Sequence, residues 1–340
     1  MSGSWQEPVW SGFPVPAQEL DEETRAAKRL PRTLRTTAGE GVEQRLVFEP
    51  ALKQYENAYR AMDPVFTDPA QGEVWRAARR RALELVLAAI GGSEWVDSLV
   101  LRGSVLLSAW FGATAREPGD LDFVVVPRSW RIDEARTARL FDGVAAAAES
   151  LAAARGAGVA FDAREAVLED IWTYDRVPGR RMVLPWSAPG LPGGHVQLDF
   201  VFNEELAEAP EPVELPDGTV LLAATPALSL AWKLMWLIDD AYPQGKDLYD
   251  AVLLAERHPL PYDLLLRVFR LSGSHTLAGR HREEITPADV SQAAGYVEWD
   301  HFVTEYPAFT HREREFADRL IQALAPTFAG RSEGAGPVLP

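Results

Sequence analysis

Two aspartates separated by a single leucine, Asp120 and Asp122, stand at the start of the apolar run "DFVVV". Because a strand alternates its side chains between two faces, both carboxylates emerge on one face and can share a hard divalent cation. Phe123 and Val125 then face the other way. Carboxylates this close repel one another, and a divalent metal relieves the repulsion. The pair predicts a metal site or, equally on these residues alone, two solvated acids at an exposed strand start.

A third acid, Asp199, lies in the apolar stretch "HVQLDFVF". Three strand-borne carboxylates suit a two-metal site, in which one ion helps to deprotonate a hydroxyl and the other neutralises a triphosphate and its leaving oxygen. Gln197 and Val201 share a strand face with Asp199, so a half-exposed sheet is an equal explanation of this acid taken alone. Its combination with Asp120 and Asp122 favours the metal site.

Two further features could hold phosphate. Gly103-Ser104 lies where an apolar run gives way to a helical pattern, and there glycine permits a close backbone approach while free N–H groups face an anion. A tight turn is the more common explanation of such a step. Lys233, a lone cation in "LSLAWKLMWLI", could reach a phosphate or extend to the surface. Both interpretations of Lys233 stay open.

The stretch "GKDLYD" places Lys246, Asp247 and Asp250 close together. On a helix Lys246 and Asp250 are one turn apart, so a surface ion pair is as good an explanation as a binding site. The sequence has no Walker A loop, dinucleotide fingerprint, nucleophile elbow or H-x-x-x-H pair. No other motif competes with the carboxylates.

The elements that position these residues follow from periodicity. Apolar spacing predicts a helix over 73–90 that ends at Gly91-Gly92, and a long alanine-rich helix over 133–158. Short β-branched runs predict strands at 98–103, 121–127, 159–175, 179–188 and 195–204, with a helix at 104–111. Helical patterns at 225–242, 246–258 and 261–273 complete the chain. The order predicts a mixed sheet with helices, followed by a helical module.

Composition limits the partners and the compartment. The chain lacks cysteine, which excludes thiolate metal sites and fits a reducing compartment. It lacks a signal peptide and an apolar run long enough for a bilayer, so we expect a cytoplasmic protein without membrane contact. A net charge of −16 means that a polyanion must use a local basic patch. The candidate cations are Arg25, Lys28, Arg29, Arg32 and Arg35 in a loosely structured, solvated N-terminal arm, and Arg79, Arg80 and Arg81, for which solvated helix charge is favoured.

Taken in order, these motifs resemble the AbiEii/AbiGii toxin-type nucleotidyltransferases of the polymerase-β-like superfamily, over about residues 73–270. Arg116 precedes Asp120 by four residues, as in the family's R-x-S-x-D-I-D pattern, although Pro118 stands where serine is common. The matching positions are Gly103, Ser104, Arg116, Asp120 and Asp122, then Asp199 as the third acid, and Lys233, Lys246, Asp247 and Asp250 as the C-terminal helical motif.

The resemblance implies an α+β fold, in which a polymerase-β-like mixed sheet flanked by helices precedes a helical C-terminal module. From the resemblance together with the pattern along the chain, we expect an arm (1–72, partly irregular), a catalytic domain (73–225), a helical domain (226–330) and a tail (331–340), although the resemblance does not account for the arm or the end of the chain. Mg²⁺, in a two-ion site, and an NTP would be bound. Asp120, Asp122 and Asp199 would serve as metal ligands, with Asp199 assisting or acting as base. Gly103 and Ser104 would hold phosphates, and Lys233 and Lys246 would neutralise the triphosphate.

The implied reaction is transfer of a nucleotide to an acceptor. In some members of the family the acceptor is the 3′ end of tRNA, and the enzyme is the toxin of a toxin–antitoxin pair used in phage defence. Transfer to a small molecule or a protein side chain is an alternative, because an acidic surface favours a cationic acceptor. A catalytically silent nucleotide-binding protein is the other.

Overall fold

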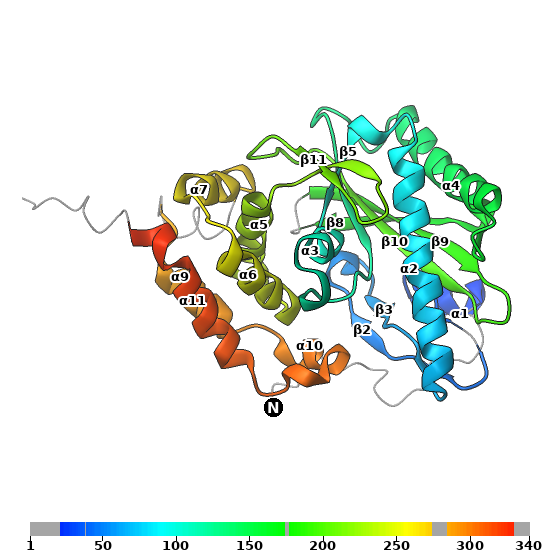
Figure 1. Ribbon diagram of the computed structural model, residues 1–340, viewed down its shortest axis with the longest axis horizontal. Helices are drawn as coiled ribbons and strands as arrows, with labels where there is room; N and C mark the ends of the chain where they lie inside the picture. The colour runs from blue at the N-terminus through cyan, green and yellow to red at the C-terminus, as the bar shows by residue number, and fades with distance from the viewer. Residues whose placement is uncertain (1–20, 38, 174–176, 274–283, 330–340) are drawn as a thin grey trace, which may run out of the picture. The chain divides into compact units, whose positions relative to one another are not determined.

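The computed structural model describes residues 21–37, 39–173, 177–273 and 284–329 (Figure 1). The chain divides into two compact units that interleave along the sequence. The first, the sheet unit, contains the described residues up to Val105 together with Pro118–Glu204 and Pro212–Leu222. The second, the helical unit, contains Leu106–Glu117, Glu205–Glu211 and the described residues from Ala223 onwards. The chain therefore passes between units several times.

An eight-stranded mixed sheet forms the centre of the sheet unit. Its order is β11-β12-β5-β6-β10-β9-β7, and β8 also pairs with β9. β6 and β10 run parallel, whereas β5 with β6 and β10 with β9 are antiparallel. The strands are β5 (Leu99–Arg102), β6 (Leu121–Val125), β7 (Ala160–Phe161), β8 (Val167–Thr173), β9 (Val177–Ser187), β10 (Gly194–Val201), β11 (Glu211–Glu214) and β12 (Val220–Ala223). The predicted mixed sheet is confirmed, although β11 and β12 were not predicted and the predicted strand 159–175 is divided into β7 and β8.

Two long helices, α2 (Pro69–Gly91) and α4 (Ala135–Arg155), cover one face of this sheet. They pack against each other, and α2 also contacts β10. Phe141 of α4 meets Phe200 edge-on at 5.1 Å, and Phe200 stacks on Phe123 at 5.6 Å between ring centroids. α4 ends at Gly156, whose left-handed φ of 54° closes the helix. The apolar side of the strands is therefore the helix-covered face.

The N-terminal segment, residues 21–66, packs on the opposite face. Glu169 of β8 accepts hydrogen bonds from the backbone N–H groups of Arg32 (2.9 Å) and Thr33 (3.1 Å). Burial and a hydrogen bond with Glu169 raise the pKa of Tyr55 to about 12. The segment comprises α1 (Glu22–Ala27), β1 (Val42–Glu43), β2 (Leu46–Phe48), the short 3-10 helix η1 (Pro50–Leu52), β3 (Tyr59–Ala61) and β4 (Val65–Phe66).

The prediction of a loosely structured, solvated arm, made for residues 1 to about 40, is wrong for residues 21–37, where Arg25, Leu30 and Leu34 are buried. Leu34 and Leu52 are each only 1% exposed, and Leu52 packs with Ile171 of β8. Strands of two or three residues give too short a pattern for periodicity to detect. Residues 1–20 and the predicted tail at 331–340 lie outside the described residues.

Helices make up most of the helical unit. They are α3 (Ser104–Phe111, from Leu106 on), α5 (Pro226–Asp239), α6 (Gly245–Arg257), α7 (Tyr262–Leu271), α9 (Pro287–Ala294), α10 (Trp299–Glu305) and α11 (Glu313–Ala329). α5 and α11 both pack on α6. At the start of α6, a Cβ on Gly245 would lie 2.8 Å from Cβ of Phe302, so the glycine permits close packing against α10. Among the described residues, none of the helices has the length and apolar character that a bilayer crossing requires.

Candidate active site

Five charged side chains form one row, here called the charged row, across the face of the sheet opposite α2 and α4, where the N-terminal segment packs. Register pairs Asp122 with Arg102 on one side and with Asp199 on the other, and Asp199 is paired in turn with Arg181. Glu169 of β8 follows beside Arg181. Residues directly opposite each other on neighbouring strands point to the same face, away from Phe123 and the covering helices. Asp122 and Asp199 are therefore immediate neighbours, as the sequence predicted for strand-borne acids.

Gly103 leaves room for the carboxylate of Asp122 because it has no Cβ. Its φ is +84°, and a Cβ built on it would lie 2.5 Å from Oδ2 of Asp122. Any other residue would be strained at this φ and would also press on the carboxylate. The glycine thus brings the backbone of the turn into α3 directly against the acid.

Ser104 follows as the first residue of α3 and is buried. Within the part of the chain that the structure describes, its Oγ has no hydrogen-bond partner. A buried hydroxyl without a partner costs free energy, and a ligand oxygen would remove that cost. The N–H groups of the first helical turn also lack intrahelical acceptors and attract anions. The step has the features that the predicted phosphate cradle requires.

Asp199 is held by Arg181, a residue that the sequence reading missed. The guanidinium donates from Nε to Oδ1 and from Nη2 to Oδ2, each at 2.8 Å, and Nη1 lies 3.6 Å from Glu49. Burial raises the pKa of the Asp199 carboxyl; Arg181 opposes this rise, and the nearby charge of Asp120 adds to it. Nε2 of Gln197 lies 3.4 Å from Oδ2 as well, whereas Oδ1 accepts from Arg181 and keeps a second lone pair. Asp199 is therefore fixed in position while it still can accept a further bond.

Asp120 lies two residues before Asp122, half-buried at the last position of the loop before β6. The loop before it is tied to α2, since Nη2 of Arg79 donates to the carbonyl of Gly119 at 3.0 Å. Nη1 of Arg79 binds Asp63 at 2.6 Å. Arg79 is only 5% exposed, so its interpretation as solvated helix charge is wrong. It instead supports the backbone that presents Asp120.

Asp120 and Asp122 suit a hard cation that takes its remaining ligands from water and substrate phosphates. The described residues contain no group of three or more His, Cys, Asp or Glu side chains arranged to hold a metal ion. Mg²⁺ is commonly held by one or two carboxylates and completes its shell with water and substrate phosphates. Asp120 and Asp122 beside a phosphate cradle match that mode. The residues fit magnesium bound together with a nucleotide.

The predicted residues of the helical unit form a separate buried network. Nε and Nη2 of Arg116 donate to both oxygens of Asp250 at 3.0–3.2 Å. Nζ of Lys233 lies 2.7 Å from Asp247 and 2.9 Å from Asp250. Burial raises the pKa of Asp250, but Arg116 and Lys233 outweigh burial and hold it below its usual value. Two cations and two anions thus neutralise one another.

This network changes the interpretation of two motifs. Asp250 is fully buried, so it is not half of a surface ion pair with Lys246, which is half-exposed. Lys233 is buried as well and does not extend to the surface. The predicted nucleotide-binding roles of these residues stay predictions. What the structure establishes is that "KDLYD" and Arg116 meet within one unit.

Comparison with family models gives a match over more than half of the chain. The model of the family described as nucleotidyl transferase AbiEii toxin, type IV TA system, covers residues 85–325. The chain belongs to this family. Its description makes the protein a nucleotidyl transferase toxin of a type IV toxin–antitoxin system and implies a cognate antitoxin. No curated protein matches the chain. The N-terminal segment lies outside the matched residues.

Proposed function

We propose that the protein is a Mg²⁺-dependent nucleotidyltransferase that moves an NMP from an NTP to a hydroxyl of an RNA acceptor, such as the 3′ end of tRNA. The observation that supports this most is the contact of Gly103 with Asp122, beside the unpartnered hydroxyl of Ser104. This contact places the carboxylate of Asp122 directly beside Gly103-Ser104, the step that we propose binds phosphate.

Each residue then has a task. Asp120 and Asp122 bind the metal, which, when present, neutralises charge on the triphosphate and acidifies the attacking hydroxyl. Ser104 Oγ and the first N–H groups of α3 donate hydrogen bonds to phosphate oxygens. Arg116, Lys233, Lys246, Asp247 and Asp250 are assigned to nucleotide binding on the strength of the family motif.

The reaction replaces the phosphoanhydride bond between the α- and β-phosphates of the NTP with a phosphodiester bond to the acceptor. The acceptor oxygen attacks the α-phosphorus, a new P–O bond forms, and the bond to the bridging oxygen breaks to release pyrophosphate. The hydroxyl proton passes to the second lone pair of Asp199 Oδ1, on a carboxylate whose burial-raised pKa suits a base. Arg181 keeps that carboxylate in place throughout.

Label transfer tests the proposal. The protein is incubated with α-labelled NTPs, Mg²⁺ and total tRNA, and the labelled macromolecule is identified. Asp122→Asn removes one charge with little change in shape and should abolish transfer. Asp142→Asn, an exposed acid on α4 and so on the helix-covered side of the sheet, should leave transfer unchanged. Wild-type transfer by Asp122→Asn would contradict the assigned site. Retained NTP binding without label on any acceptor would favour the silent nucleotide-binding protein.

A further inference from the structure

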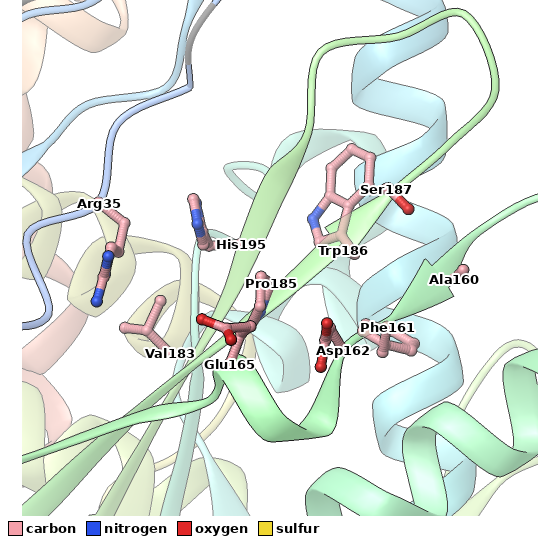
Figure 2. A pocket seen from close by; sticks show the side chains of 10 residues that line it. All are labelled: Arg35, Ala160, Phe161, Asp162, Glu165, Val183, Pro185, Trp186, Ser187 and His195. Atoms are coloured by element: carbon pink, nitrogen blue, oxygen red, sulfur yellow. The ribbon is translucent and has the colours of Figure 1, made fainter. Parts of the chain in front are cut away.

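The face of the sheet opposite α2 and α4 contains a cavity of about 410 Å³ (Figure 2), which lies further along β9 and β10 than the charged row. Its lining includes Val183 and Pro185 of β9, and His195 of β10. Arg181, Val183 and Pro185 alternate along β9, so they share one face. His195 pairs with Pro185, and Asp199 pairs with Arg181. The cavity therefore opens on the same face as the proposed catalytic acids.

The distance along the strand is short. His195 and Asp199 are four residues apart on β10, which is roughly 13 Å at about 3.3 Å per residue. Gln197 lies between them, and its strand position is next to that of Asp120 because Leu198 pairs with Leu121. A nucleic-acid strand bound in the cavity could therefore extend along the sheet and bring its end to Asp199 and Asp120.

The lining combines two kinds of polar group. Figure 2 shows Arg35 from the N-terminal segment and His195 from β10. Glu165 comes from the turn η4 (Ala163–Glu165), and Asp162, which caps this turn by accepting from the N–H of Arg164, directly precedes it. The guanidinium and the imidazole can donate hydrogen bonds to a phosphate. The two carboxylates repel a bare polyanion but accept hydrogen bonds from ribose hydroxyls and base amino groups. A cavity of this size is within the range that holds a small organic ligand.

The wall that carries Arg35 is not part of the family match. Arg32 and Thr33 fix the segment to Glu169 through their backbone N–H groups, which brings Arg35 to the cavity two residues later. Arg25, by contrast, is buried and donates to the carbonyl of Leu34, so it has a structural role in the segment. Arg35, one of the cations predicted to meet RNA, lines this cavity.

We infer that this cavity binds a phosphate-bearing nucleotide of the acceptor strand, upstream of the hydroxyl that is modified. Arg35 and His195 contact its phosphate, Asp162 and Glu165 accept from its sugar or base, and Val183 with Pro185 forms the apolar floor. The inference rests on the proposed function, because the acceptor is defined by the transfer reaction. It makes the N-terminal segment an acceptor-recognition element.

Binding of a short single-stranded RNA, labelled with fluorescein at its 5′ end and with a free 3′ hydroxyl, tests this directly by fluorescence anisotropy. Arg35→Ala should raise the Kd for this RNA about tenfold and lower the slope of log K against log salt by about one. Arg45→Ala removes an exposed arginine of the same segment outside the cavity lining and should change neither value appreciably. Arg35→Lys should recover part of the affinity.

Kinetics provide the second measurement. Arg35→Ala and His195→Gln should raise KM for the acceptor while KM for the NTP stays unchanged, and urea unfolding checks that each variant is folded. Equal loss of RNA affinity in Arg35→Ala and Arg45→Ala would overturn the inference, as would an absence of RNA binding by the wild type. If Arg35 governs RNA binding but the wild type transfers no label, the cavity stands and the proposed reaction fails. If transfer occurs and both cavity variants behave as wild type, the cavity assignment fails alone.

Discussion

Gly103→Ala is the substitution whose effect the structure defines best. At φ +84° an alanine is in a region that costs about 1–3 kcal/mol for a residue with a Cβ. The new Cβ would lie 2.5 Å from Oδ2 of Asp122, so the carboxylate must retreat by about 1 Å to reach ordinary van der Waals contact. A displacement of this size in a catalytic group can cost about 100-fold in rate.

A matched control separates strain from displacement. Gly218 has φ +83°, and a Cβ there would meet nothing within 4 Å. Gly218→Ala should therefore show a similar loss in the free energy of unfolding, measured with urea, but normal label transfer. Gly103→Ala should show the same loss together with transfer reduced about 100-fold. If both variants transfer label equally, the contact between Gly103 and Asp122 has no part in catalysis and the reasoning is refuted.

Three further predictions concern residues that hold the two polar clusters. Asp250→Ala leaves Arg116 and Lys233 buried without this partner, so it should destabilise the protein by about 3–5 kcal/mol, and a loss below about 1 kcal/mol in urea unfolding would contradict the network. The pKa of Asp250 is lower in the folded than in the unfolded protein, so its charge stabilises the fold fully above the unfolded pKa of about 4, and this stabilisation is lost as the pH falls through the folded-state pKa. The urea midpoints of the wild type and Asp250→Asn should therefore converge at acid pH. A difference in midpoint that stays constant with pH would contradict this prediction. Arg79→Met removes the donor to the Gly119 carbonyl and should lower kcat about tenfold or more with NTP affinity little changed, measured by single-turnover label transfer; an unchanged kcat would show that Arg79 only stabilises α2.

The sequence predicted the parts of the fold that depend on local pattern. The strand at 121–127 and the helix at 104–111 correspond to β6 and α3, because β-branched runs and apolar spacing reflect burial within one element. Asp122 and Asp199 were grouped as strand acids, and register makes them neighbours. The family assignment followed from the same motifs and is confirmed.

Which distant residues lie side by side could not be predicted from the sequence pattern. Arg181 lies beside Asp199 only because β9 pairs with β10 in one register, and a shift by one residue would turn it to the other face. Likewise, for Asp250 the sequence offered a surface ion pair with Lys246 or a binding site as equal explanations, whereas its partners Arg116 and Lys233 lie 134 and 17 residues earlier in the chain. The strand alternation in "GRRMVLP" was the available signal for Arg181, but it could not say which of the two arginines faces the acids.

The central claim is that Asp120 and Asp122 bind the metal and that Gly103-Ser104 binds the triphosphate. The most direct measurement is a crystal structure with a non-hydrolysable NTP analogue and Mn²⁺ in place of Mg²⁺, in which anomalous diffraction locates the metal. We expect the anomalous peak at the carboxylates of Asp120 and Asp122, with a phosphate oxygen accepting from Ser104 Oγ. A metal bound elsewhere, or a triphosphate that leaves Ser104 without a partner, would contradict the account.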